Sequence, residues 1–228
     1  WPFADRKGEL VAEIEAPSSD AILMASVAPG GSIMVSSGAG GALDWWDAQQ
    51  HLWVAHSPSD PNSETGHGDD ITQLAWTHDG SSAVSSSEDG TLIVWNALSR
   101  KAVRVLKGHE GSVTSFVIST SGSRRFILSA STDSTLRLWG GNNWNCLKVF
   151  RNTNSSFAHS KAVNCVVFST LVDLSGTPLY ALSGSDDWTI RSWHVTDFLD
   201  PNQADQAGQD EWTDDEGSSE SEDEAPTK

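Results

Sequence analysis

The chain has 228 residues, with 31 Asp and Glu against 14 Lys and Arg, which gives a net charge of −17 at pH 7. This balance argues against general binding to nucleic acid, which requires clustered basic residues. There is no apolar run long enough to predict a membrane-spanning helix. Two Cys residues, Cys146 and Cys165, do not make a disulfide framework, and we expect both to be buried reduced thiols.

The predicted elements are short strands, because runs rich in Val, Ile, Leu, Thr and Trp are divided by Gly, Ser, Asp and Asn. This pattern fits a single all-β domain of this length, and no long amphipathic helix is predicted. Residues 1–16 read as the last two strands of a preceding unit, comparable with residues 95–106. We expect further units at about 17–56, 67–107, 108–151 and 158–195, followed by an acidic tail at 196–228.

One arrangement of four side chains occurs three times in the predicted units. A His is followed by a Ser, an Asp comes four residues after that Ser, and a Trp comes six residues after the Asp. The Ser–Asp–Trp spacing is constant, whereas the gap from His to Asp varies, as expected of a repeated unit with a variable connector. The three sets are His67, Ser85, Asp89, Trp95; His109, Ser129, Asp133, Trp139; and His159, Ser183, Asp187, Trp193.

These strings resemble the WD-repeat family, and the resemblance covers most of residues 1–195. It implies a β-propeller in which each blade has four antiparallel strands and the Asp lies in the turn between the second and third. Gly90 suits that turn, and Ser134 and Trp188 fit it less well. We expect the C-terminal part of a seven-bladed ring, with about four blades and the first and last incomplete. The alternatives are a four-bladed ring closed by residues 9–15 and a ring completed by a partner chain.

The resemblance also implies that each His–Ser–Asp–Trp set forms a buried, hydrogen-bonded chain with a structural role. The set recurs in three successive units and ends on a Trp, which favours a scaffold over a catalytic triad. The seven His residues show no metal-ligand spacing, and no glycine-rich phosphate loop precedes a helix. We therefore predict no enzymatic activity, no cofactor and no metal.

A fourth copy, at the start of the chain, is degraded. Aligned with the second unit, it keeps Ser36 and Trp46, whereas Gly40 replaces the Asp and Ser18 replaces the His. We expect this blade to keep its apolar pattern and to lose the polar chain.

The family resemblance also implies a partner-binding face with two exposed positions in each blade. One precedes the first apolar residue of the first strand, and the other precedes the turn Asp. The acidic members and Trp188 suggest a site for a basic peptide, with packing of Trp188 on a neighbouring blade as the alternative. The positions are Ala21, Asp70, Ser112 and Ala162 in the first set and Ala39, Glu88, Thr132 and Asp186 in the second. Two long connections, 47–66 and 169–176, are further candidates for contact with partners.

The segment 197–228 contains 12 acidic residues and one Lys, and it has no apolar periodicity. It is expected to be disordered on its own. It either raises solubility or binds a basic partner, with Trp212 as an anchor. Glu follows Thr213, Ser219 and Ser221 by three residues, which predicts phosphorylation by acidophilic kinases.

Together these features predict a non-enzymatic interaction scaffold within a multiprotein complex, in the nucleus or cytoplasm. Its partners are other proteins, including basic peptides or proteins, without direct binding to nucleic acid or membrane. One alternative is a sensor or substrate-recruiting domain fused to an enzyme, such as a nucleotide-hydrolysing switch or a ubiquitin-ligase component. Another is a chromatin or ribosome-assembly factor whose acidic tail binds basic partners.

Overall fold

The computed structural model describes residues 13, 21–60, 62, 64–121, 124–140, 143–152, 158–169 and 180–195. Several predictions fall outside these residues. They are the strand pair expected within 1–16, Ser18, the lengthened loop after residue 169, and the whole tail with Trp212, Thr213, Ser219 and Ser221.

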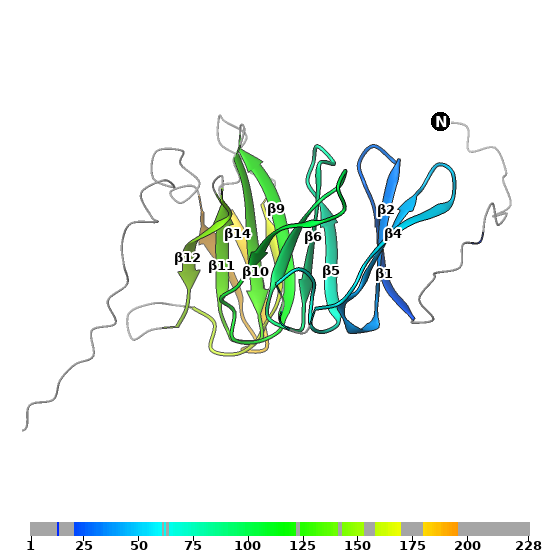
Figure 1. Cartoon of the computed structure of the whole chain (residues 1–228). Coiled ribbons are helices and arrows are strands. Elements are labelled where there is room, and N and C mark those ends of the chain that lie inside the picture. Colours follow the sequence, from blue (N-terminus) through cyan, green and yellow to red (C-terminus); the bar gives the residue numbers. More distant parts are fainter. Residues whose placement is uncertain are drawn as a thin grey trace, which may run out of the picture.

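Four antiparallel sheets follow one another in chain order across the molecule (Figure 1). Within each sheet the strands also pair in chain order, so every connection is a hairpin. Sheet A comprises β1 (Ile22–Val27), β2 (Ile33–Gly38), β3 (Leu43–Asp47) and β4 (Leu52–Ser57). Sheet B comprises β5 (Ile71–Trp76), β6 (Ser82–Ser87), β7 (Leu92–Asn96) and β8 (Ala102–Leu106).

Sheet C comprises β9 (Val113–Ser121), β10 (Arg124–Ser131), β11 (Leu136–Gly140) and β12 (Asn145–Phe150). Sheet D comprises β13 (Val163–Phe168), β14 (Tyr180–Ser185) and β15 (Ile190–His194). A single 3-10 turn, η1 (Ala39–Gly41), is the one helical element of the described residues. The prediction of an all-β fold built from repeated sheets is confirmed, and the sheets form part of a β-propeller.

The expected long connection 47–66 is shorter than the sequence suggested. Strand β4 lies inside it and completes sheet A as a four-stranded blade. The apolar residues Leu52, Trp53 and Val54 supply this strand, and only the segment after Ser57 remains a loop.

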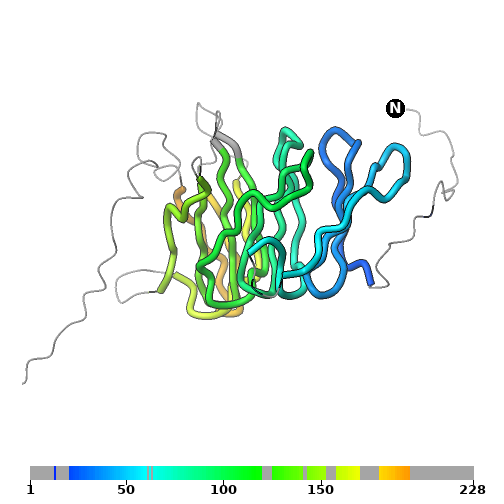
Figure 2. The backbone as a smooth tube through the Cα atoms, in the orientation of Figure 1, coloured from blue at the N-terminus to red at the C-terminus, as the bar shows by residue number. Residues whose placement is uncertain are grey.

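The first strands of successive sheets, β1, β5, β9 and β13, lie side by side, and the backbone tube in Figure 2 passes through the sheets one after another in chain order. Gln73 joins β5 to β9, because its amide donates from Nε2 to the Phe116 carbonyl and accepts from the Phe116 N–H, both at 2.9 Å. Thr72 adds a bond from its hydroxyl to the Val113 carbonyl at 2.6 Å. These side chains replace ladder bonds between strands that do not belong to one sheet.

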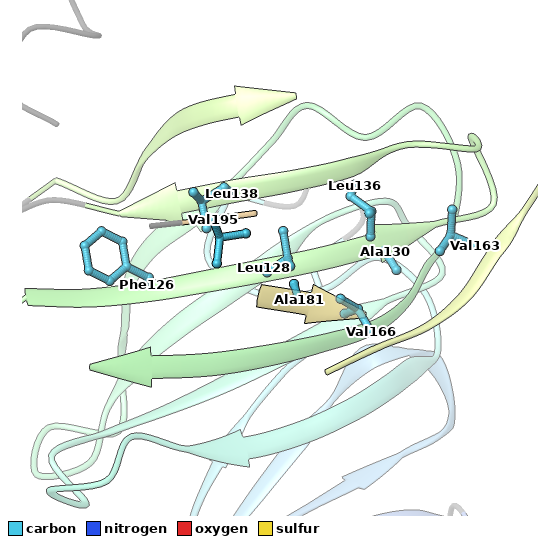
Figure 3. Close-up of a cluster of buried hydrophobic side chains, with 9 residues drawn as sticks. All are labelled: Phe126, Leu128, Ala130, Leu136, Leu138, Val163, Val166, Ala181 and Val195. Atoms are coloured by element: carbon cyan, nitrogen blue, oxygen red, sulfur yellow. The ribbon is translucent and has the colours of Figure 1, made fainter. Parts of the chain in front are cut away.

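The hydrophobic core lies between the sheets and is divided into one cluster for each pair of neighbours. Figure 3 shows the cluster between sheets C and D, where Leu128 and Leu138 lie close to Ala181 and Val195. Alternation along each strand sends one set of side chains into the cluster on either side of a sheet. Burial of these side chains, at about 25 cal/mol per Å² of apolar surface, holds neighbouring blades together.

Sheet D has one covered and one open face among the described residues. Val166 and Ala181 face sheet C and are buried, whereas Val167 is 52% exposed and Ile190 is 81% exposed on the other side. Cys165 is also exposed, so the expectation that both thiols are buried is wrong for this residue. It lies on an inner strand of the last described sheet, where the described residues provide no further sheet to cover it.

Candidate functional site

The polar chain of sheet C shows how each predicted set of four is assembled. Trp139, on β11, donates from Nε1 to Ser129 Oγ on β10 at 2.9 Å. Ser129 Oγ lies 2.8 Å from His109 Nε2, and His109 Nδ1 lies 2.9 Å from Asp133 Oδ2. Because an ionised carboxylate only accepts, the His carries its hydrogen on Nδ1, and each group donates to the next. The chain joins two strands, the loop before the sheet, and the turn between the second and third strands of the sheet, which we call the b–c turn.

Sheets B and D repeat this geometry. In each, the Trp indole donates to Ser Oγ, the Ser hydroxyl meets His Nε2, and His Nδ1 faces the Asp carboxylate. The distances, in that order, are 2.7, 2.7 and 3.3 Å for Trp95, Ser85, His67 and Asp89, and 2.8, 2.7 and 2.9 Å for Trp193, Ser183, His159 and Asp187.

The electrostatics of these chains favour a charged Asp in each, and a neutral His109 in sheet C. Burial alone would raise the pKa of Asp133, but hydrogen bonds from His109, from the Thr135 hydroxyl and from the Glu110 N–H outweigh it and hold the pKa well below its usual range. The pKa of His109 is lowered by burial and by the Arg137 guanidinium, which outweigh the raising effect of Asp133. Asp89 and Asp187 have pKa values lowered in the same way.

The Ser hydroxyls of these chains are unsuited to nucleophilic attack. Ser85 and Ser129 are completely buried, and the oxygen of each is already engaged by both an indole N–H and an imidazole. A nucleophile needs an open approach for its substrate. The arrangement can hold loops and strands in place, which is a mechanical role.

Sequence reasoning missed a fifth member of each chain, a Thr two residues after the Asp. In sheet C, Thr135 donates from Oγ1 to Asp133 Oδ1 at 2.7 Å and lies 3.2 Å from His109 Nδ1. Thr91 and Thr189 occupy the same place in sheets B and D. The signal was present in the sequence, because Asp-x-Thr follows the same spacing in all three units.

Sheet A keeps more of the polar chain than the sequence suggested. Trp46 Nε1 donates to Ser36 Oγ at 2.8 Å, as in the other sheets, so the expected loss of the whole chain is wrong. At the Asp position, Gly40 instead donates its N–H to Asp70 Oδ1 at 2.6 Å, at the entrance to sheet B. Sheet A therefore retains the Trp–Ser bond that joins two of its strands, and its turn is hydrogen-bonded to the residue before sheet B.

A second polar cluster exists only in sheet A. Asp44 is 4% exposed, and its Oδ1 accepts from Trp53 Nε1 at 3.1 Å and lies 2.9 Å from His56 Nδ1. The equivalent position in sheet B is the aliphatic Ile93. Nothing in the repeat pattern marked Asp44, because the residue departs from that pattern.

The predicted face positions are brought together in pairs at the b–c turn end of the sheets. In each of three sheets, the residue before the turn Asp donates its N–H to the carbonyl of the residue before the first strand. The pairs are Glu88 with Asp70 at 2.9 Å, Thr132 with Ser112 at 3.0 Å, and Asp186 with Ala162 at 3.0 Å. The two sets of candidates thus form one row along the rim rather than two separate surfaces.

The acidic residues of this row differ in whether their carboxylates already accept hydrogen bonds. The Asp70 carboxylate already accepts from Gly40, and the Asp186 carboxylate accepts from Asn164 Nδ2 at 2.6 Å. Glu88 and Thr132 are exposed and accept no hydrogen bond from another side chain among the described residues. Asp70 therefore has a structural task as well as its place on the face.

Trp188 is the most exposed large apolar side chain of this row, at 94%. It occupies the turn position after Asp187 with φ of 68°, a left-handed conformation that disfavours a bulky side chain. Gly90 takes the same place in sheet B, where a Cβ would lie 3.1 Å from the carbonyl oxygens of His109 and Gly111. The Trp188 indole is thus held in a strained turn and exposed to solvent.

Searches for other kinds of site add little. In the part of the chain that the structure describes, no group of three or more His, Cys, Asp or Glu side chains is placed to hold a metal ion. Within the same residues, no helix has the length and apolar character needed to span a membrane.

Comparison with known proteins matches the repeats to a family model. The model described as "WD domain, G-beta repeat" matches residues 60–96, 100–140 and 144–194, which together make up more than half of the chain.

Curated relatives match a large part of this chain but a small part of their own length. The Dictyostelium discoideum "Periodic tryptophan protein 2 homolog" is 29% identical over 67% of this chain and 16% of its own. The Schizosaccharomyces pombe "Pre-mRNA-splicing factor cwf17" is 31% identical over 56% of this chain and 35% of its own. The chain thus spans between about a sixth and a third of these relatives.

Solved structures agree in fold. The structure of U3-55K aligns with a TM-score of 0.64 at 17% identity, covering 81% of this chain and 52% of that one. The computationally designed Ika4 protein aligns with a TM-score of 0.62 at 22% identity, covering 82% of this chain and 98% of that one.

Proposed function

Because the chain belongs to the WD-repeat family, we propose that it acts as a non-enzymatic, rigid platform for protein–protein interaction within an intracellular multiprotein complex. The observation that carries this proposal is the pairing along the rim. Internal hydrogen-bonded chains fix the b–c turns, and those turns present Glu88, Thr132 and Asp186 to solvent. A surface that is rigid before binding loses little conformational entropy when a partner docks.

We propose further that a basic peptide binds at the sheet D end of this rim. Trp188 offers an exposed indole face, and the exposed carboxylate of Asp186 lies two residues away in the same turn. A Lys or Arg side chain can stack on an indole while its charge is met by a carboxylate. The alternative, in which Trp188 packs on a neighbouring blade, would require that blade to accommodate an indole at a turn position where, in sheet B, a Cβ on Gly90 would lie 3.1 Å from carbonyl oxygens of the loop entering sheet C.

The test is the affinity of the full chain for a fluorescent decalysine peptide and an arginine-rich peptide of equal length. Trp188→Ser should weaken binding by about tenfold, as expected for loss of an aromatic anchor. Leu98 provides a matched control, because it is also an exposed apolar residue, at 86%. It lies in the turn between β7 and β8 of sheet B, at the end of β7 away from the b–c turn. Equal affinity of Trp188→Ser and Leu98→Ser for both peptides would contradict the proposed site.

Among the finer roles, the relatives favour assembly of nuclear ribonucleoprotein particles. Names among them include a pre-mRNA-splicing factor, a "Pre-mRNA-processing factor 19" and a "U3 snoRNP-associated protein-like" protein. In this role the chain would contact proteins of the particle, since its negative charge disfavours direct binding to RNA. A cross-linking map of the native complex would support this role if links reached ribonucleoprotein subunits. Links to a GTPase or to ubiquitin-ligase subunits would support the alternative of a recruiting domain fused to an enzyme.

A further inference from the structure

Basic residues gather on the outer strand of sheet B. No Lys or Arg occurs between Lys7 and Arg100, and then Arg100, Lys101, Arg104 and Lys107 follow within eight residues, four of the 14 basic residues in the chain. The corresponding outer strand of sheet A, β4, has no Lys or Arg. Four basic residues are thus gathered at one blade edge of a chain whose net charge is negative.

These charges have no ionic partner among the described residues. Lys101, Arg104 and Lys107 are exposed, and no ion pair between described residues includes them. The Lys107 ammonium donates one hydrogen bond, to the Asn62 carbonyl at 3.2 Å. Like charges this close on one strand repel one another, so the edge favours a negatively charged ligand.

The basic edge borders a hollow of about 330 Å³, which we call the β8 groove. Val103, one of its lining residues, is 59% exposed. Among the strands that the structure describes, β8 pairs only with β7, so its outer backbone N–H and C=O groups offer an edge for an added strand. The residues that line the groove are Glu64, Ala102, Val103, Arg104, Val105 and Lys107.

The loop that contributes Glu64 to the groove is held in one conformation by hydrogen bonds to Asp60. The Asp60 carboxylate accepts from the N–H groups of Asn62, Glu64 and Thr65, at 3.0, 3.1 and 2.9 Å. The Asp60 N–H donates to the His67 carbonyl at 2.8 Å, which anchors the loop to the start of the sheet B polar chain. The groove therefore exists before any ligand binds.

We propose that residues 209–224 of this chain dock in the β8 groove. This segment has nine acidic residues, no basic residue, no Pro and a single Trp, Trp212. Its composition complements the groove, because its carboxylates can pair with Arg104 and Lys107 in the groove and with Lys101 beside it, while the indole can cover the exposed Val103. The absence of Pro leaves every backbone N–H available for pairing with β8.

The chain length permits this contact within one molecule. The 15 residues from Val195 to Asp210 can span about 50 Å when extended. A domain of this size has a radius of gyration of about 15 Å, so the segment can reach sheet B from the end of sheet D. Docking would shield the acidic segment, and a basic partner would compete with the groove for it. Phosphorylation of Thr213, Ser219 or Ser221 would strengthen docking by adding negative charge.

Zero-length carbodiimide cross-linking of the full chain tests this inference, because the reagent joins only Lys and carboxylates in direct contact. We expect Lys101 and Lys107 to be joined to acidic residues within 209–224. In an equal mixture of ¹⁴N- and ¹⁵N-labelled chains, the links should join peptides with the same label. Arg104→Glu should lower the yield about fivefold, since it reverses one of three contributing charges. Trp212→Ser, which leaves the charge of the tail unchanged, should also lower it.

The control is Lys161→Glu, which makes the same change in charge at an exposed position before sheet D. It should leave the yield at Lys101 and Lys107 unchanged, and all variants should keep the melting temperature of the parent chain. Equal losses in Arg104→Glu and Lys161→Glu would show a non-specific charge effect and overturn the proposal. Links of the tail to Lys161 as frequent as those to Lys107, or links only between differently labelled peptides, would overturn it as well.

Discussion

Sheet A contains only the Trp–Ser part of the polar chain, whereas sheets B to D contain the complete chain of Trp, Ser, His and Asp. All four keep the indole-to-hydroxyl bond, for example Trp46 to Ser36 at 2.8 Å and Trp139 to Ser129 at 2.9 Å. Sheets B to D add a His and an Asp that tie the b–c turn to the loop entering the sheet. The difference teaches that the chain has two separable halves. The Ser and Trp brace two strands, and the His and Asp fix the turn on the rim.

Acid should affect the sheets with complete chains most strongly. The pKa values of Asp89, Asp133 and Asp187 are lowered in the folded state, so their contribution to stability is present above about pH 4 and is lost as the pH falls below it. The lowered pKa of His109 means that the unfolded chain takes up a proton first, and stability starts to fall below about pH 6.5. Urea unfolding from about pH 8 to about pH 3 should show both declines, and a flat free energy of unfolding would refute this assignment.

Removing one turn carboxylate should give the largest effect of any single substitution. Asp133→Ala deletes the acceptor of bonds from His109, Glu110 and Thr135, and should lower the free energy of unfolding by about 3 kcal/mol. The matched change in sheet A is Gly40→Ala, where a Cβ meets no atom within 4 Å. It should cost about 1 kcal/mol, from the left-handed backbone alone. Denaturant titration measures both, and equal costs would contradict the division between the sheets.

Substitution of the Ser in sheet A and in sheet B compares a partial polar chain with a complete one. Ser85→Ala leaves both the Trp95 indole N–H and the His67 Nε2 atom without a partner, whereas Ser36→Ala leaves only the Trp46 indole N–H. We expect losses of about 2–3 kcal/mol and about 1 kcal/mol, because each buried group left unpaired adds its own cost. Thermal unfolding followed by circular dichroism should rank the two variants in this order. The reverse order would show that sheet A depends on its Ser more than the bonds indicate.

The smallest expected effect is a gain in stability. Trp188 has φ of 68° and little packing, so Trp188→Gly should raise the free energy of unfolding by about 0.5–1 kcal/mol. Loss of basic-peptide binding in the same variant would show that the strained backbone at Trp188 is retained because the indole contacts the peptide. A destabilised Trp188→Gly chain would mean that the indole packs on another part of the protein.

The sequence was sufficient to predict the repeated sheets, because the Ser–Asp–Trp spacing is the same for Ser129, Asp133 and Trp139 as for their counterparts in sheets B and D. The resemblance to the WD-repeat family implied the polar chains and the positions that form the row on the rim. The sequence did not predict the Asp44 cluster or the bond from Gly40 to Asp70, because these occur only in sheet A, where the repeat is broken. The exposure of Cys165 was missed because it depends on whether a further blade covers sheet D, which spacing within one unit does not show.

A double-mutant cycle on His109 and Asp133 tests the central claim most directly, that the polar chains act as braces of the blades. Their side chains meet at 2.9 Å, so His109→Ala, Asp133→Ala and the double variant should give unfolding free energies that couple by about 1.5–3 kcal/mol. Each substitution should leave partner binding at Trp188, in the next sheet, within about twofold of the parent chain. Additive losses in stability, with no coupling between the two residues, would contradict the account.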